Sequence, residues 1–168
     1  MRRVVVLVLV GGLLLGACGG GGDEAADTST STTSTTEPPA EPIVIRTRVV
    51  IAATSGSEPI ATGEVLERST LGDAPFCAGG TILDSHGDAD PAVEPYGLID
   101  RTISCPNGTL RIGFTPDETQ GLHQTGSWTI VSGTGVFGGA QGSGELEVKY
   151  DPNDDAIAHE TYTGTVTR

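Results

Sequence analysis

The chain has 168 residues, of which 22 are acidic and 9 are basic, so its formal net charge is −13 at pH 7. Affinity for nucleic acid comes mostly from Lys and Arg side chains that meet phosphates, so this composition predicts no nucleic-acid partner. The acidity is expected to serve solubility, with cation binding as the alternative.

The first predicted element is an apolar run at the N-terminus. Met1-Arg2-Arg3 is positively charged, residues 4–15 are apolar apart from two glycines, and small residues follow. This order is typical of a secretory signal peptide. The run is shorter than the about 20 apolar residues that a transmembrane helix needs. Residues 1–17 are therefore predicted to be a signal peptide that directs the chain out of the cytoplasm.

The end of this run, Leu15-Gly16-Ala17-Cys18, resembles the lipobox of bacterial lipoproteins. The resemblance implies that the chain is cleaved before Cys18 and that the Cys18 sulfur is linked to diacylglycerol. Stable anchoring takes two lipid signals, and the two acyl chains of that group supply them. We therefore expect an extracytoplasmic protein that is lipid-anchored to the bacterial cell membrane.

Residues 18–42 are predicted to be the lipidated cysteine followed by a disordered tether. After Cys18 the segment consists of Gly, Ala, Asp, Glu, Pro and a Ser/Thr tract, and it contains no large apolar residue. Such a segment cannot bury enough surface to offset its chain entropy. The Ser/Thr tract over residues 28–36 is also a candidate for O-linked sugar.

Residues 43–168 are predicted to form one β domain. Short alternating apolar and polar runs are separated by glycines, and no 3.6-residue apolar stripe is present. Eight strands are predicted, over residues 43–51, 63–71, 76–83, 98–105, 109–115, 121–131, 144–150 and 159–167. Eight strands suit a closed antiparallel β-barrel, which has no exposed edge strand. A β-sandwich is the alternative.

The two cysteines of this domain, Cys77 and Cys105, are predicted to form a disulfide. Outside the cytoplasm an even number of cysteines is typical of disulfide pairing. A zinc or redox site is the alternative, although the sequence has no C-x-x-C motif.

Four residues are candidates for the inside of the barrel. Arg101 shares its strand parity with Ile99 and Ile103, so it is expected to point inward and to need a carboxylate partner. Glu160, on the parity of Tyr162, is the candidate partner. A lumen that contains Arg101, Trp128, Glu160 and Tyr162 would orient a small, partly polar ligand. In the alternative interpretation, Arg101 reaches solvent at a strand end or a bulge reverses its parity.

Other patterns favour no further chemistry. Asp84, Asp88 and Asp90 concentrate oxygen donors, but their spacing departs from the EF-hand pattern, so a turn is expected there. Residues 151–155 are expected to form a hairpin turn. Residues 133–138 fit G-x-G-x-x-G without the helix that a phosphate site requires. The histidines are scattered and no G-x-S-x-G elbow occurs, which disfavours a hydrolase. No metal, no cofactor and no catalytic residue is assigned.

The segment Ser132-Gly-Thr-Gly-Val-Phe-Gly-Gly-Ala-Gln-Gly-Ser-Gly144 resembles the glycine-rich signature of allene oxide cyclase-like barrels, a superfamily shared with plant dirigent proteins. The resemblance implies an eight-stranded antiparallel barrel with a largely apolar lumen, and trimers by analogy with the plant relatives. The plant cyclases steer ring closure of an unsaturated fatty-acid epoxide with a few polar residues in the lumen.

Three functions follow as hypotheses. The first is a tethered lipoprotein whose barrel binds a small apolar ligand or an envelope partner. The second is an isomerase or cyclase that acts in the lumen, and the third is a structural surface module with a filled barrel. The lumen discriminates among them, because an apolar cavity with one or two buried charges favours binding or catalysis.

Overall fold

The strands begin where the predicted tether ends. The computed structural model describes residues 38–52, 60–87 and 98–168. The predicted signal peptide, Cys18 and most of the tether lie outside the described residues. Within these residues no helix has the length and apolarity needed to cross a membrane.

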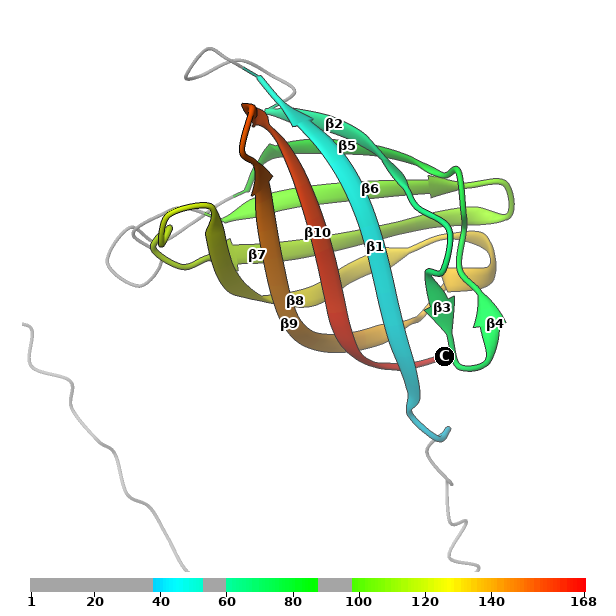
Figure 1. The fold of residues 1–168 in the computed structure, drawn as a ribbon. Coiled ribbons are helices and arrows are strands. Elements are labelled where there is room, and N and C mark those ends of the chain that lie inside the picture. The colour runs from blue at the N-terminus through cyan, green and yellow to red at the C-terminus, as the bar shows by residue number, and fades with distance from the viewer. Residues whose placement is uncertain (1–37, 53–59, 88–97) are drawn as a thin grey trace, which may run out of the picture. The chain divides into compact units, whose positions relative to one another are not determined.

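Eight antiparallel strands close into a barrel (Figure 1). In order around the barrel they are β1 (Glu41–Ile51), β2 (Ala61–Val65), β5 (Thr81–His86), β6 (Ile99–Cys105), β7 (Gly108–Pro116), β8 (His123–Gly133), β9 (Gln141–Asp151) and β10 (Asp154–Thr167). The last strand, β10, pairs with β1 along ten residues and closes the ring. The predicted all-β, eight-stranded antiparallel barrel is confirmed, and the sandwich alternative is wrong.

The predicted second strand, residues 63–71, is interrupted. Its first part is β2, and its second part is β3 (Thr70–Leu71), which pairs with β1 and with the short strand β4 (Ala74–Pro75). Between β2 and β3, the Ser69 hydroxyl accepts a hydrogen bond from the Arg46 amide (2.9 Å). The Ser69 hydroxyl thus replaces a backbone partner for the Arg46 amide of β1, so strand pairing can stop between β2 and β3 without leaving this amide unbonded.

The predicted third strand, residues 76–83, starts later, at Thr81. The preceding residues form a turn in which the Gly80 amide donates to the Cys77 carbonyl (2.8 Å). Cys77 in this turn and Cys105 at the end of β6 form a disulfide, with their Cα atoms 5.4 Å apart. The predicted disulfide is therefore confirmed in the structure, and the zinc alternative is wrong.

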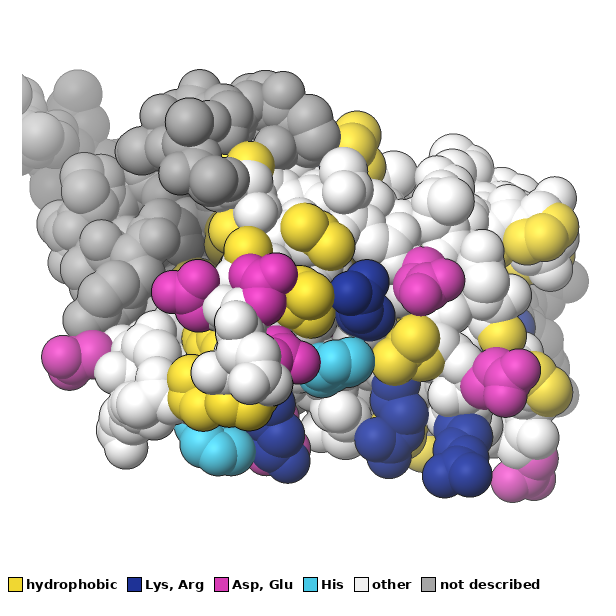
Figure 2. All heavy atoms as spheres, turned by 45° about the horizontal axis from the view of Figure 1, so that its top comes forward, with side chains coloured by type: hydrophobic (Ala, Val, Ile, Leu, Met, Phe, Trp, Pro, Cys, Tyr) yellow, Lys and Arg dark blue, Asp and Glu magenta, His cyan; other side chains and the backbone are white. Residues whose placement is uncertain are grey.

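Strand alternation sorts the side chains as expected along most strands. On β7, Leu110, Ile112 and Phe114 are buried in the barrel, whereas Arg111 is exposed. One apolar residue does not follow this alternation, because Leu122 precedes β8 and is exposed. On the outer face shown in Figure 2, acidic, basic and hydrophobic side chains are interspersed.

One part of the barrel interior is packed around Trp128. Trp128 on β8 is the cross-strand partner of Gly144 on β9, and Gly144 is in turn the partner of Gly164 on β10. A Cβ atom on Gly164 would lie 2.7 Å from the indole Cζ2 atom. The indole nitrogen donates to the carbonyls of Glu145 and Thr163, each at 3.2 Å. The absence of a side chain at Gly164 thus leaves room for the indole ring, which reaches from β8 to the backbone of β10.

The glycine-rich connection between β8 and β9 is a short 3-10 turn, Gly135–Phe137. Gly135 begins it with φ of 60°, in the left-handed region that favours glycine. Phe137 is buried and contacts Phe76, with the ring centroids 5.6 Å apart. The glycine-rich segment therefore turns the chain at one end of the barrel and buries Phe137 there.

Candidate functional site

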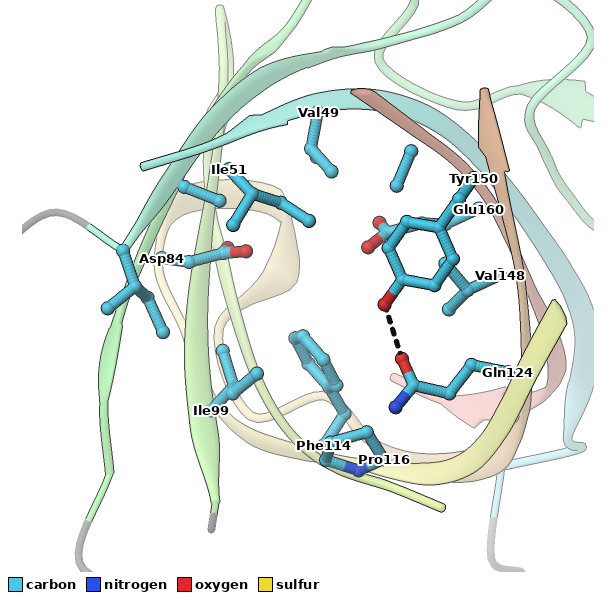
Figure 3. A pocket seen from close by; sticks show the side chains of 13 residues that line it. Val49, Ile51, Asp84, Ile99, Phe114, Pro116, Gln124, Val148, Tyr150 and Glu160 are labelled. Atoms are coloured by element: carbon cyan, nitrogen blue, oxygen red, sulfur yellow. Dashed lines mark hydrogen bonds between the residues drawn. The ribbon is translucent and has the colours of Figure 1, made fainter. Parts of the chain in front are cut away.

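The opposite end of the barrel holds a cavity of about 320 Å³ (Figure 3). Side chains near one end of all eight barrel strands line it. The apolar lining residues are Val49, Ile51, Ile60, Ala61, Ile99, Phe114, Pro116, Val148 and Ala158. The polar lining residues are Asp84, Gln124, Tyr150 and Glu160.

The sizes of the inward side chains explain why this end is open. Around the cavity the inward positions are mostly small or branched, such as Ala61, Ala158 and Val49. The other end receives Trp128, Phe137 and further large side chains. Protein interiors are normally close-packed. The small side chains at the cavity end do not fill the space inside the barrel, so the barrel is packed at one end and hollow at the other.

Arg101 lies beneath this cavity and is fully buried (0% exposed). It occupies an inward position in the middle of β6, with Asp84 of β5 as its direct cross-strand partner. The guanidinium meets the Asp84 carboxylate at two points: Nε donates to Oδ1 (2.7 Å) and Nη2 donates to Oδ2 (2.5 Å). Such a two-point pair fixes the plane of the guanidinium.

The other N–H groups of Arg101 point to β10. Nη1 donates to Glu160 Oε2 and to the Tyr162 hydroxyl (2.5 Å), and Nη2 also donates to Glu160 Oε1 (3.3 Å). The Thr47 hydroxyl donates to Glu160 Oε2 (2.6 Å). The described residues contain no buried side-chain nitrogen or oxygen without a partner. The cluster of Arg101, Asp84, Glu160, Tyr162 and Thr47, hereafter the Arg101 cluster, is therefore internally satisfied.

Aromatic rings complete the surroundings of the guanidinium. The Arg101 Cζ atom lies 5.0 Å from the centroid of the Phe114 ring and 5.4 Å from that of Tyr162, both within the range of cation–π attraction. Trp128 contacts the far side of Tyr162 edge-on, with ring centroids 6.3 Å apart. The packed half of the barrel thus supports the charged cluster from below.

Burial shifts the protonation equilibria of this cluster. It raises the pKa of Asp84 against the opposing effect of Arg101, and the nearby charge of Glu160 raises it further. Burial lowers the pKa of Arg101. The interactions with Glu160, Tyr162 and Asp84 raise it by more, so the pKa of Arg101 lies well above the usual arginine range. Burial also raises the pKa of Tyr162 well above its usual value, so its hydroxyl stays protonated.

Three of the four residues predicted for the lumen are brought together. Arg101, Glu160 and Tyr162 form one hydrogen-bonded group, and the ion pair between Arg101 and Glu160 is present as the sequence led us to expect. The alternative of a solvent-exposed Arg101 is wrong. Trp128 does not join this group, but its ring packs against that of Tyr162. Of the four predicted residues, only Glu160 lines the cavity.

Sequence reasoning missed Asp84, which was assigned to a turn. The structure places it on β5, buried and paired with Arg101, because β5 continues to His86. Its parity with the buried Ile82 is the signal that could have identified it. Asp88 and Asp90, the other members of that acidic segment, lie outside the described residues. Within the described ranges, no group of three His, Cys, Asp or Glu side chains could hold a metal ion.

The predicted turn at residues 151–155 is present between β9 and β10. Asp151 Oδ1 accepts a hydrogen bond from the Asn153 amide (2.8 Å), the local bond that makes aspartate favourable in turns. This turn belongs to the hairpin and not to a ligand site.

Comparison with known proteins identifies no relative: no family model, no curated protein and no solved structure matches the chain.

Proposed function

We propose that this protein is a membrane-tethered extracytoplasmic lipoprotein whose barrel binds a small, largely apolar ligand. The observation that carries the proposal is the cavity of about 320 Å³ at one end of the barrel. Cavities of this size with mostly apolar walls and a few polar groups are typical of small-molecule sites.

The composition of the walls supports an apolar ligand. Val49, Ile51, Ile99 and Val148 surround the cavity from three strands, β1, β6 and β9. Each methylene group that a ligand transfers from water to such a wall contributes about 0.8 kcal/mol. The polar groups lie at the floor and at one side, where they can orient one end of the ligand (Figure 3).

Tethering is supported by the sequence. The apolar run that ends in Leu15-Gly16-Ala17-Cys18 resembles a lipoprotein signal, and the Gly/Ser/Thr/Pro-rich residues after it would join the lipid to β1. A Cys18→Ser variant should lose membrane association and metabolic incorporation of labelled fatty acid. An unchanged membrane fraction would contradict the anchor.

An isomerase or cyclase acting in the same cavity is the second candidate. Its support is the Asp84 carboxyl, which lines the cavity and has a raised pKa, so that it can exchange a proton nearer neutral pH. The filled structural module has less support, because small residues leave one end of the barrel unpacked.

The experiment that tests ligand binding compares two leucine variants of β10. Ala158 is buried and lines the cavity, whereas Thr163 on the same strand is exposed. Native mass spectrometry should detect one octan-1-ol bound to the purified protein and to Thr163→Leu, and none bound to Ala158→Leu. Absence of binding to the unmodified protein, or equal binding to both variants, would overturn the proposal.

A further inference from the structure

We infer that the cavity selects ligands whose buried end is a cationic amine, and that it rejects carboxylates and phosphates of the same size. This inference rests on the proposed function, because it specifies the chemistry of the ligand that the cavity would hold.

The first observation is that Arg101 has no donor left for an anion. A guanidinium has five N–H groups. Two go to Asp84, two to Glu160 and one to Tyr162. An anionic ligand would have to displace one of these internal carboxylates and leave it buried without its partner, which is strongly unfavourable.

The second observation is that two carboxylates share one cation at the cavity floor. Asp84 and Glu160 both line the cavity, whereas Arg101 lies behind them and does not. Figure 3 shows the two carboxylates pointing into the cavity from opposite sides, from β5 and β10. When both are ionised, the Arg101 cluster carries one net negative charge at the end of an apolar space. A positive charge placed there is attracted strongly, because the apolar walls lower the local dielectric constant and the carboxylates are close.

The third observation concerns the hydrogen bonds that remain. Each carboxylate has about four acceptor sites, and Asp84 uses two of them for Arg101. Glu160 accepts four hydrogen bonds, two from Arg101 and one each from Thr47 and Tyr162, so the free acceptor sites at the floor belong to Asp84. On the opposite side the Tyr150 hydroxyl donates to Gln124 Oε1 (2.7 Å), and one of the two N–H groups of Gln124 Nε2 donates to the Asp117 carbonyl (2.8 Å). An ammonium group, which only donates, complements a lining that mainly accepts.

The pKa shift at Asp84 is consistent with this inference. Burial is the main cause that raises the pKa of Asp84, and the charge of the neighbouring Glu160 raises it further. A bound ammonium would favour the ionised form of Asp84 and lower that pKa again.

The test compares three probes with the same apolar chain: octylamine, octan-1-ol and octanoate. Their affinities for the purified protein are measured by calorimetry at neutral pH, in low and in high salt. We expect octylamine to bind at least about tenfold more tightly than octan-1-ol, and octanoate to bind most weakly. This order should persist in high salt, since salt screens surface charges far more than buried ones.

Two variants locate the preference. Glu160→Gln removes one negative charge from the floor, and Glu147→Gln removes one from the exposed outer surface of β9. Glu160→Gln should reduce the ratio of octylamine to octan-1-ol affinity, whereas Glu147→Gln should leave it unchanged. If Glu160→Gln fails to fold, the order of the three probes on the unmodified protein decides the matter.

The outcomes separate the two proposals. If none of the three probes binds, the proposed ligand cavity itself is wrong. If octan-1-ol binds but octanoate binds as tightly as octylamine or more tightly, the cavity stands and the inferred preference for amines is overturned. If Glu160→Gln and Glu147→Gln change the ratio of octylamine to octan-1-ol affinity equally, the preference for amines comes from the acidic surface, and the inference about the cavity floor is overturned.

Discussion

Asp84 and Arg101 are direct cross-strand partners on β5 and β6, and their side chains join at two points, with donor–acceptor distances of 2.7 and 2.5 Å. This contact fixes the guanidinium so that its remaining N–H groups point across the barrel to β10. The same contact forms part of the cavity floor, because Asp84 also lines the cavity. The pair therefore links the stability of the barrel to the chemistry of the candidate site.

Replacing Arg101 with Met should strongly destabilise the protein. The change leaves the buried Asp84 and Glu160 without their cation, and losing one partner of a buried ion pair costs about 3–5 kcal/mol. The matched control is Arg111→Met, which removes the exposed partner of Asp100 and should cost less than about 1 kcal/mol. Urea denaturation measures both values. Similar losses for the two variants would show that the Arg101 cluster adds no special stability.

Stability should depend on pH through Asp84 with a defined sign. Burial raises the pKa of Asp84 in the folded protein. Such a carboxyl contributes stability that is fully present below the unfolded pKa and is lost as the pH rises through the folded pKa. The unfolding free energy of the native protein minus that of Asp84→Asn should therefore increase as the pH falls from neutral toward about 3.9.

Asp151 provides the opposite case. A backbone hydrogen bond from Asn153 lowers the pKa of Asp151. The contribution of Asp151 to stability is present above its unfolded pKa and is lost on acidification. The unfolding free energy of the native protein minus that of Asp151→Asn should therefore decrease as the pH falls. Urea denaturation at several pH values measures both differences. If they change with pH in the same direction, the opposite pKa shifts of Asp84 and Asp151 are contradicted.

Adding a methyl group at Gly164 should disturb the packed half of the barrel. A Cβ atom there would lie 2.1 Å from the Ser143 carbonyl oxygen and 2.7 Å from the Trp128 ring. Overpacking of this kind typically costs about 1–3 kcal/mol. Gly113→Ala is the control, because its Cβ would meet side-chain atoms at an ordinary 3.4 Å. Thermal denaturation and tryptophan fluorescence should change for Gly164→Ala alone; an unperturbed Gly164→Ala would contradict the close contact.

The disulfide should stabilise the barrel without affecting the cavity. Cys77 and Cys105 are separated by 28 positions in the sequence, and chain entropy for such a loop gives about 3–4 kcal/mol. Cys105 lies at the end of β6 opposite to Ile99, which lines the cavity. Replacing both cysteines with Ser should lower the denaturation midpoint and leave octan-1-ol affinity unchanged. A large loss of affinity in the folded variant would contradict this separation.

The sequence allowed the barrel to be predicted because its strands alternate clearly. In β7 the buried Leu110, Ile112 and Phe114 follow a period of two, and the inward parity of Arg101 followed from the same rule. Local interruptions were harder to predict. The break between β2 and β3 depends on the Ser69 hydroxyl meeting the backbone of Arg46, a contact between residues 23 positions apart.

Only part of the candidate site could be predicted. The need of a buried arginine for a carboxylate leads to Glu160, whereas Asp84 follows the predicted strand 76–83 and begins an aspartate-rich segment that is expected to form a turn. The cavity itself depends on how the small side chains of eight strands converge at one end, which no single strand reveals. The space that Gly164 leaves for Trp128 likewise depends on the register of three strands.

The most direct test of the ligand cavity is a methyl NMR titration of the purified protein with octan-1-ol. The account predicts shifts of the methyl signals of Val49, Ile51 and Ile99, which line the cavity, while Ile103 and Leu110 in the packed interior stay unchanged. Saturable shifts confined to the first group would support ligand binding in the barrel. No saturable shift, or equal shifts in both groups, would contradict it.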